Sequence, residues 1–179
     1  RRRVQLAPDA FSVAGPEGAY VYHALGSAPW ARDATAIMTT PGRVRVTMLR
    51  VGDDPVPSLE EREAVRLSLI DNDVRPLTDM VEVLGPTVHP VTITAKLTLY
   101  PGPDGNLVRD RAVTALTTWV ETNRMLGMNL HRSAIFSKLH QEGVHSVDLI
   151  SPATDIVLGP TEVYAVEAIT ITVADLRDA

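Results

Sequence analysis

Alternation of apolar and polar residues is the clearest pattern in the chain, and it is strongest in two places. Residues 91–100 read VTITAKLTLY, so that apolar side chains alternate without a break with threonine, lysine and tyrosine. Residues 43–50 read RVRVTMLR and alternate valine and methionine with arginine and threonine. A period of two is typical of a strand with one dry and one wet face. Both stretches are therefore predicted to be strands.

A helix and a further strand follow the first of these stretches. After two prolines, Ser58 and Glu61 form a capping box, in which each side chain can accept a hydrogen bond from the backbone amide of the other residue. The box predicts a helix that runs to about Ile70. Residues 79–84 are then predicted to be a strand, which gives a β-α-β module.

The second alternating stretch opens a larger module. A helix is predicted after the turn at 101–105, because apolar residues recur at helical spacing on one side of it. These residues are Val108, Ala112, Ala115, Leu116 and Trp119. A second helix is predicted to close with Gly143 and Val144, a pair typical of a Schellman cap. The predicted order is β-α-α-β-β, with the second helix over about 132–142 and the last strands at about 144–150 and 165–173.

The fold class is therefore predicted to be α+β, with two small αβ modules in tandem after an irregular segment. Residues 1–32 contain turn sequences and a short helix at about 19–25, and are predicted to end a truncated upstream domain. The first module is predicted over 33–85 and the second, C-terminal module over 86–179. Pro86 and Pro90 bound the linker between them. Proline fixes its own backbone and cannot donate a ladder hydrogen bond, so the linker is expected to be a rigid coupling.

Composition restricts the function classes. The 179 residues are 45% hydrophobic and 22% charged, which is typical of a soluble globular protein. The net charge of -5 argues against a nucleic-acid partner, which would favour a basic surface. The chain has no cysteine, so neither a disulfide nor a thiolate metal site can form. No stretch approaches the roughly 18 apolar residues of a membrane helix, so no membrane partner is expected.

Motifs for catalysis or cofactor binding are missing from the sequence. Neither Gly-rich phosphate loop occurs, nor does the G-x-S-x-G sequence of a hydrolase nucleophile. The five histidines include no pair at positions i and i+4, the spacing of a helical zinc site. The chain is therefore predicted not to be an enzyme and to bind neither metal nor cofactor.

One acidic stretch imitates a calcium loop. Asp71, Asp73, Asp79 and Glu82 fall at the first, third, ninth and twelfth positions of such a loop. The sixth position, which should be glycine to permit a sharp turn, is Pro76. An ordinary polar turn followed by a strand explains these residues better.

Three stretches are candidates for contacts with other proteins: the segment 11–22, the linker 86–90 and the helix 131–140. Tyr20 and Tyr22 could anchor an interface, since aromatic residues often carry interface energy. Alternatively, one of them packs in its own domain and the other is simply exposed. The candidate contact residues are Phe11, Tyr20, Tyr22, Pro86, His89, Pro90, His131, Phe136 and His140.

Several short motifs, in order along nearly the whole chain, resemble phage baseplate J proteins. The matching sequences are RRRVQLAP at 1–8, FSVAGP and GAY at 11–20, DVRPLTD at 73–79, LTLYPGP at 97–103, and SAI, LH, EGV and SP between 133 and 152. Each motif alone is weak, whereas the ordered set is specific.

The resemblance implies a structural protein of the baseplate wedge of P2-like or Mu-like contractile tails and of R-type tailocins. Such proteins join wedge subunits in a ring around the hub and couple baseplate rearrangement to sheath contraction. The implied partners are other copies of the chain and neighbouring wedge proteins, with the hub and sheath as further candidates. The implied location is the tail baseplate or tailocin particle, assembled in the bacterial cytoplasm.

Two other functions are compatible with the bare sequence. Tandem αβ modules can form a small-molecule binding or regulatory protein, which would need an enclosed pocket with convergent polar groups. A hydrolase acting on the cell envelope would need a carboxylate pair in a cleft, and the sequence nominates no such pair.

Overall fold

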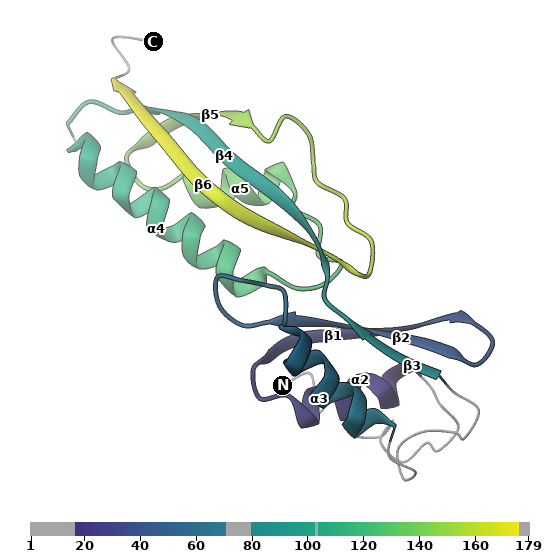
Figure 1. Ribbon diagram of the computed structural model, residues 1–179. Coiled ribbons are helices and arrows are strands. Elements are labelled where there is room, and N and C mark those ends of the chain that lie inside the picture. The colour runs from purple at the N-terminus through teal and green to yellow at the C-terminus, as the bar shows by residue number, and fades with distance from the viewer. Residues whose placement is uncertain (1–16, 71–79, 103, 176–179) are drawn as a thin grey trace. The chain divides into compact units, whose positions relative to one another are not determined.

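The chain folds into two compact units, each with its own three-stranded sheet (Figure 1). The computed structural model describes residues 17–70, 80–102 and 104–175. The N-terminal unit comprises the chain up to Thr87 together with the short segment Pro160–Glu162. The C-terminal unit comprises the remaining residues from Val88 onward.

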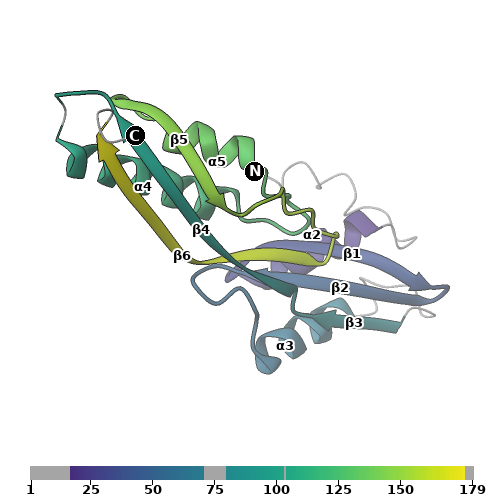
Figure 2. The same ribbon diagram turned by 90° about the horizontal axis from the view of Figure 1, so that it is seen from above.

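The N-terminal unit contains a helix, a hairpin and a crossover to a third strand. Strands β1 (Ala31–Thr40) and β2 (Arg43–Arg50) pair antiparallel, and Figure 2 shows them side by side. Helix α3 (Leu59–Leu69) then returns the chain so that β3 (Met80–Leu84) pairs parallel with β2. The predicted β-α-β arrangement is confirmed, and the hairpin strand β1 and helix α2 (Glu17–Ser27) extend it.

The core of this unit includes the short N-terminal helix. Val44, Val46 and Met48, the apolar positions of the alternating stretch, are all buried. Tyr20 and Ala24 of α2 are buried in the same cluster. The sequence pattern had assigned this helix to a segment ahead of the module, whereas its apolar face packs with the sheet of the N-terminal unit.

Strand β1 was not expected from the sequence. Its inward positions are the small residues Ala34 and Ala36, which pair with Met48 and Val46 of β2. Small apolar residues give a weak alternation signal, which is why the strand was missed. A turn with Gly42 at φ 76° follows the strand. The turn sequence Pro-Gly between two alternating stretches was the sign of a hairpin that could have revealed it.

The capping box at the start of α3 is confirmed. The Ser58 hydroxyl accepts a hydrogen bond from the Glu61 amide at 3.1 Å, and the Glu61 carboxylate accepts one from the Ser58 amide at 2.8 Å. Both donors would otherwise lack a partner in the first turn of the helix.

Replacing Ser58 by alanine removes this cap, so we expect the free energy of unfolding to fall by about 1 kcal/mol. Urea denaturation followed by circular dichroism measures the change. Ser68→Ala, within the same helix, is the matched control and is expected to change the stability little. A loss no greater for Ser58→Ala than for Ser68→Ala would show that the box contributes nothing.

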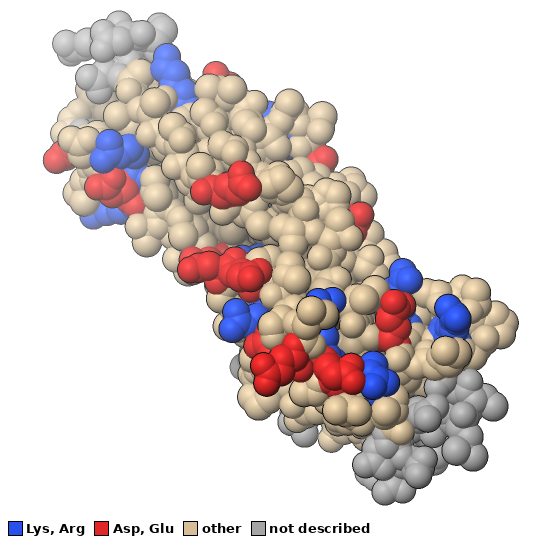
Figure 3. All heavy atoms as spheres, in the orientation of Figure 1, with Lys and Arg blue, Asp and Glu red and all other residues tan. Residues whose placement is uncertain are grey.

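Charged side chains on this unit pair locally. Arg66 contacts Glu63 one turn away at 2.7 Å, and Arg45 of β2 contacts Glu82 of β3 at 3.3 Å. Figure 3 shows basic and acidic side chains interspersed on the face that is drawn. Such exposed pairs contribute little to stability, because water and salt screen them.

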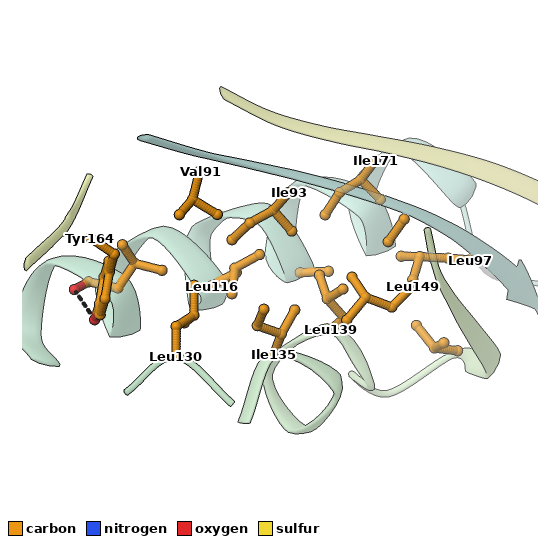
Figure 4. Packing of buried hydrophobic residues seen from close by; sticks show 14 of the residues in the cluster. Val91, Ile93, Leu97, Leu116, Leu130, Ile135, Leu139, Leu149, Tyr164 and Ile171 are labelled. Carbon is orange, nitrogen blue, oxygen red and sulfur yellow. Dashed lines mark hydrogen bonds between the residues drawn. The ribbon is translucent and has the colours of Figure 1, made fainter. Parts of the chain in front are cut away.

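The C-terminal unit has the strand order β5-β4-β6, and two helices cover one face of that sheet (Figure 4). Strands β4 and β5 pair antiparallel, and the arrows of β4 and β6 point in the same direction in Figures 1 and 2. The predicted order β-α-α-β-β is confirmed. The elements are β4 (Thr87–Leu99), α4 (Gly105–Asn123), α5 (Arg132–Leu139), β5 (Val144–Ser151) and β6 (Glu162–Asp175).

The dry face of β4 forms the centre of the C-terminal core. Ile93 and Leu97 point from β4 toward the helices, where Leu116 of α4 and Ile135 and Leu139 of α5 meet them (Figure 4). All five side chains are fully buried. The alternation in residues 91–99 therefore predicted the correct face.

Helix α5 ends at Leu139, whereas the sequence predicted a helix that continues to about residue 142. The last bond runs from the His140 amide to the Phe136 carbonyl at 2.9 Å. Gly143, with φ 94°, lies in the turn before β5, where the Val144 amide bonds to the Gln141 carbonyl. The prediction that this glycine caps the helix was therefore wrong, and the residue belongs to the turn that follows.

The predicted linker is also shorter than expected. Strand β3 ends at Leu84 and β4 begins at Thr87, so only Gly85 and Pro86 lie between the two strands. Pro90 lies inside β4, ahead of Thr94, where pairing with β5 begins. Its missing N–H therefore breaks no bond to β5.

Candidate interaction surfaces

The candidate sites among the described residues are the three stretches that the sequence nominated for contacts with other proteins. No group of three or more metal-ligating side chains occurs within residues 17–70, 80–102 and 104–175. None of the described helices combines the length and the apolar character needed to cross a membrane. The imitation of a calcium loop falls mostly on residues 71–79, outside the described residues.

The first candidate surface, residues 11–22, is described only in part. Phe11 lies outside the described residues. Tyr20 is 2% exposed and belongs to the N-terminal core, which is the second of the two interpretations that the sequence allowed. Tyr22 is half-buried, and its ring meets that of His23 edge to face at 5.4 Å. A contact through Tyr22 stays a prediction.

The second candidate surface, residues 86–90, joins the end of one sheet to the start of the other. Pro86 is buried, His89 is half-buried and Pro90 is exposed. Gly85 precedes them, and a Cβ atom there would lie 2.8 Å from the Val56 Cγ1 atom. The chain therefore needs a residue without a side chain at this position, because the loop before α3 passes close by.

The third candidate surface is built around the start of α5. The His131 Nδ1 atom lies 2.8 Å from the Asp155 Oδ2 atom, and the Arg132 amide donates to Asp155 Oδ1 at 2.7 Å. Asp155 thus acts as an N-terminal cap supplied from a distant loop, because it accepts from a first-turn amide of the helix. Phe136 packs against the core, and His140 is exposed beyond the helix end.

Arg132, at the start of α5, also bonds to the chain just before Asp155. Its guanidinium donates to the Pro152 carbonyl and, at 3.1 Å, to the Leu149 carbonyl. It also lies over the Phe136 ring, with the Cζ atom 5.6 Å from the ring centroid. Arg132 therefore stabilises both the end of β5 and the loop that follows it.

Backbone bonds fix the rest of this loop. Leu130 and Ile156 exchange two hydrogen bonds, of 2.9 and 3.0 Å, and the Leu158 amide donates to the Asn129 side-chain oxygen at 2.9 Å. We call residues 129–132 and 152–158 the α5 clamp. Asp155 and Arg132 were missed by sequence reasoning, since no local motif links residues 23 positions apart.

The electrostatics of the clamp favour an ionised Asp155. The hydrogen bond from His131, followed by that from the Arg132 amide, lowers the pKa of the Asp155 carboxyl group. In the N-terminal unit the Ser58 amide and Arg50 likewise lower the pKa of Glu61. Each group binds its proton less readily in the folded chain than in the unfolded chain, so the folded state is favoured where the carboxylates are ionised.

We therefore expect the stabilising contribution of these two carboxylates to be complete above their ordinary pKa values, 4.5 for Glu61 and 3.8 for Asp155, and to be lost as the pH falls below those values through the lowered pKa of each folded group. Urea midpoints measured across the acid range test this. Asp155→Asn, which cannot titrate, is expected to start less stable and to lose less on acidification. An Asp155→Asn variant as acid-sensitive as the parent chain would contradict the assignment.

A shallow hollow lies over β2 and β3 in the N-terminal unit. Its volume is about 290 Å³, and Arg43, Arg45, Met80 and Glu82 are among its lining residues. Arg45 and Glu82 pair with each other there. The hollow combines both charges on an exposed surface, so it does not resemble an enclosed ligand pocket.

Comparison with known proteins identifies a protein family that the C-terminal unit resembles. Residues 91–172, which span the core of the C-terminal unit, match the family model described as the baseplate J-like protein C-terminal domain. The resemblance of the sequence to the baseplate J family is therefore confirmed, and residues 91–172 are the part that the family model matches.

A protein similar to this chain over most of its length is baseplate protein J of Escherichia phage P2. The two chains are 36% identical over 162 residues, which cover 90% of this chain and 54% of the phage protein. The chain therefore spans about half the length of the curated relative that it matches. Its likeness includes the N-terminal unit, because the aligned residues far exceed the matched domain.

The fold also resembles a chain in a solved assembly, the six-fold symmetrised cryo-EM structure of the anti-feeding prophage baseplate. The TM-score is 0.61, and the match covers 93% of this chain and 41% of the other. Sequence identity is 15%, so this likeness concerns the fold alone. Both units of the chain are covered by it.

Proposed function

We propose that the chain is part of a structural protein in the baseplate wedge of a contractile phage tail or tailocin. In this role it joins wedge subunits in a ring around the hub and couples baseplate rearrangement to sheath contraction. Its partners are other copies of itself and neighbouring wedge proteins. The protein has no catalytic task in this assignment.

The observation that carries the proposal is the 36% identity to a phage baseplate protein over 90% of the chain. The fold likeness to a chain of another baseplate supports it independently of sequence identity. A structural role in a phage tail also fits two units with ordinary apolar cores and a sequence without a recognisable active-site motif.

The connection between the units supports a mechanical role. Gly85 and Pro86 are the only residues between β3 and β4, and the chain returns to the N-terminal unit at Pro160–Glu162. In that unit the Thr87 amide bonds to the Thr161 carbonyl at 3.1 Å, and the Thr35 hydroxyl bonds to the Pro160 carbonyl at 3.0 Å. The chain thus passes between the two units at more than one place. Short connections of this kind transmit a rotation of one unit to the other better than a flexible linker does.

Complementation in the parent phage or tailocin tests the proposal. A particle producer that lacks the full-length protein is expected to yield no intact contractile tails by electron microscopy, and the full-length protein supplied in trans is expected to restore them. Mass spectrometry of purified particles is expected to find the protein in the baseplate fraction. Normal tails without the protein, or tails that lack it, would overturn the proposal.

A further inference from the structure

Strand β6 forms an edge of the C-terminal sheet. The strand order is β5-β4-β6, so within the described chain β6 has a strand neighbour on one side only. It is 14 residues long, compared with eight for β5 at the opposite edge. A strand edge presents a row of backbone donors and acceptors, and the group that matches this row best is the edge of another strand.

The second half of β6 lacks the usual protection of an edge. Residues 168–174 read AITITVA and contain no charge, proline or glycine. Natural edge strands are normally shielded by charged residues, by prolines or by their short length. The opposite edge, β5, is short, carries the exposed Asp148 and is followed by Pro152. The contrast indicates that β6 is kept suitable for pairing.

The same seven residues are self-complementary. Apolar residues and threonines alternate symmetrically about Ile171, so the pattern is the same in both directions along the strand. When two copies pair antiparallel about this residue, Thr170 of one copy lies opposite Thr172 of the other. Ile169 lies opposite Val173 of the second copy, and the two Ile171 residues face each other. Pairs of threonines and pairs of β-branched residues both stabilise an antiparallel ladder.

The faces of the two copies would also match. Ile171 is 8% exposed and points from β6 into the core, as Figure 4 shows. Thr170 and Thr172 are exposed on the opposite face of the sheet. Residues directly opposite each other in an antiparallel pair point to the same side, so the dry faces of both sheets would lie on one side.

We propose that a second copy of this chain binds along β6 through its own β6, antiparallel and centred on Ile171. The two three-stranded sheets then form one continuous six-stranded sheet with two-fold symmetry. The occupant of the edge is a second copy because the pairing surface is complementary to itself, as a two-fold interface requires. Residues 168–174 carry no charge, so the pairing brings no like charges together near the symmetry axis.

This inference deepens the proposed function and rests on it for its biological setting, since it supplies a contact between copies in the baseplate ring. The pairing of seven residues is small, so the isolated chain should dimerise weakly. Several such contacts within a closed ring strengthen one another, because each later contact forms at high effective concentration.

Paired charges at positions 170 and 172 test both the surface and the register. In the double variant Thr170→Lys/Thr172→Lys, each lysine would lie opposite a lysine of the second copy. In Thr170→Glu/Thr172→Lys, each glutamate would lie opposite a lysine. The first variant is expected to weaken the dimer at least about tenfold and the second to restore or strengthen it. Thr92→Lys, exposed on the central strand β4, is the matched control.

Sedimentation velocity of the 179-residue chain, up to about 1 mM, measures the dimer. Circular dichroism verifies that each variant is folded. A monomer at every concentration would overturn the proposal, as would a dimer that the double lysine variant leaves intact. Equal weakening by the two double variants would overturn the antiparallel register about Ile171.

The result is separable from the proposed function. If the chain is a monomer and complementation still requires the protein for intact tails, the pairing proposal fails and the baseplate role stands. If the chain dimerises through β6 and the protein is absent from purified tails, the baseplate role fails and the pairing stands.

Discussion

Truncating Leu116 to alanine will lower the free energy of unfolding of the C-terminal unit by about 2–5 kcal/mol. Leu116 lies on α4, is fully buried, and belongs to the cluster that contains Ile93 of β4 and Ile135 of α5 (Figure 4). Removing most of this side chain leaves a cavity among elements that support one another, so the neighbours can close it only in part. Urea denaturation followed by circular dichroism measures the loss.

Leu107 provides a control on the same helix. It is the same residue type, but 51% of its surface is exposed. Leu107→Ala is therefore expected to change the stability by no more than about 0.5 kcal/mol. Similar losses for the two variants would mean that α4 packs through a different face. In the particle assay, Leu116→Ala is expected to reduce the yield of tails at elevated temperature, and Leu107→Ala is not, unless Leu107 makes a contact within the baseplate.

Replacing Arg132 by alanine will destabilise the α5 clamp by about 1–3 kcal/mol. The change removes the donor to the Leu149 and Pro152 carbonyls and exposes part of the Phe136 ring. Lysine is expected not to restore the stability, because a single ammonium group cannot reproduce two donors in a planar arrangement. Hydrogen exchange at the Ile156 and Leu158 amides, which are bonded within the clamp, should accelerate.

Arg109 is the matched control for this change. It lies on the surface of α4 and pairs with its sequence neighbour Asp110 at 2.9 Å. Exposed pairs of this kind contribute little, so Arg109→Ala should leave both stability and amide exchange nearly unchanged. If Arg132→Ala left the exchange of the Ile156 amide unchanged as well, the clamp would not depend on its arginine.

Local signals predicted most of the elements correctly. The alternation in residues 43–50 and 91–99 identified two strands and their buried faces, because side chains point to opposite sides of a strand in turn. Ser58 and Glu61 located the start of α3, because a capping box needs only four consecutive residues. These features depend on neighbours along the chain, so they can be recognised before the fold is known.

Other features depend on residues that are far apart in the chain, and their signals were weak or absent. Tyr20 packs into the N-terminal core although a turn-rich segment surrounds it in the sequence. β1 relies on small inward residues whose partners are supplied by β2. Asp155 caps α5 across 23 residues, and nothing near it in the sequence indicates that role.

By itself, the sequence determined that this is an α+β chain with two modules. It also determined most of the helices and strands of those modules and the family that the chain resembles. Tertiary structure alone decided that α2 and β1 complete the first unit, that a distant loop holds the start of α5, and that β6 is an edge. The reason is physical: periodicity and capping follow from backbone geometry over a few residues. Burial of a given face and the partners of a strand are settled only when separate segments meet.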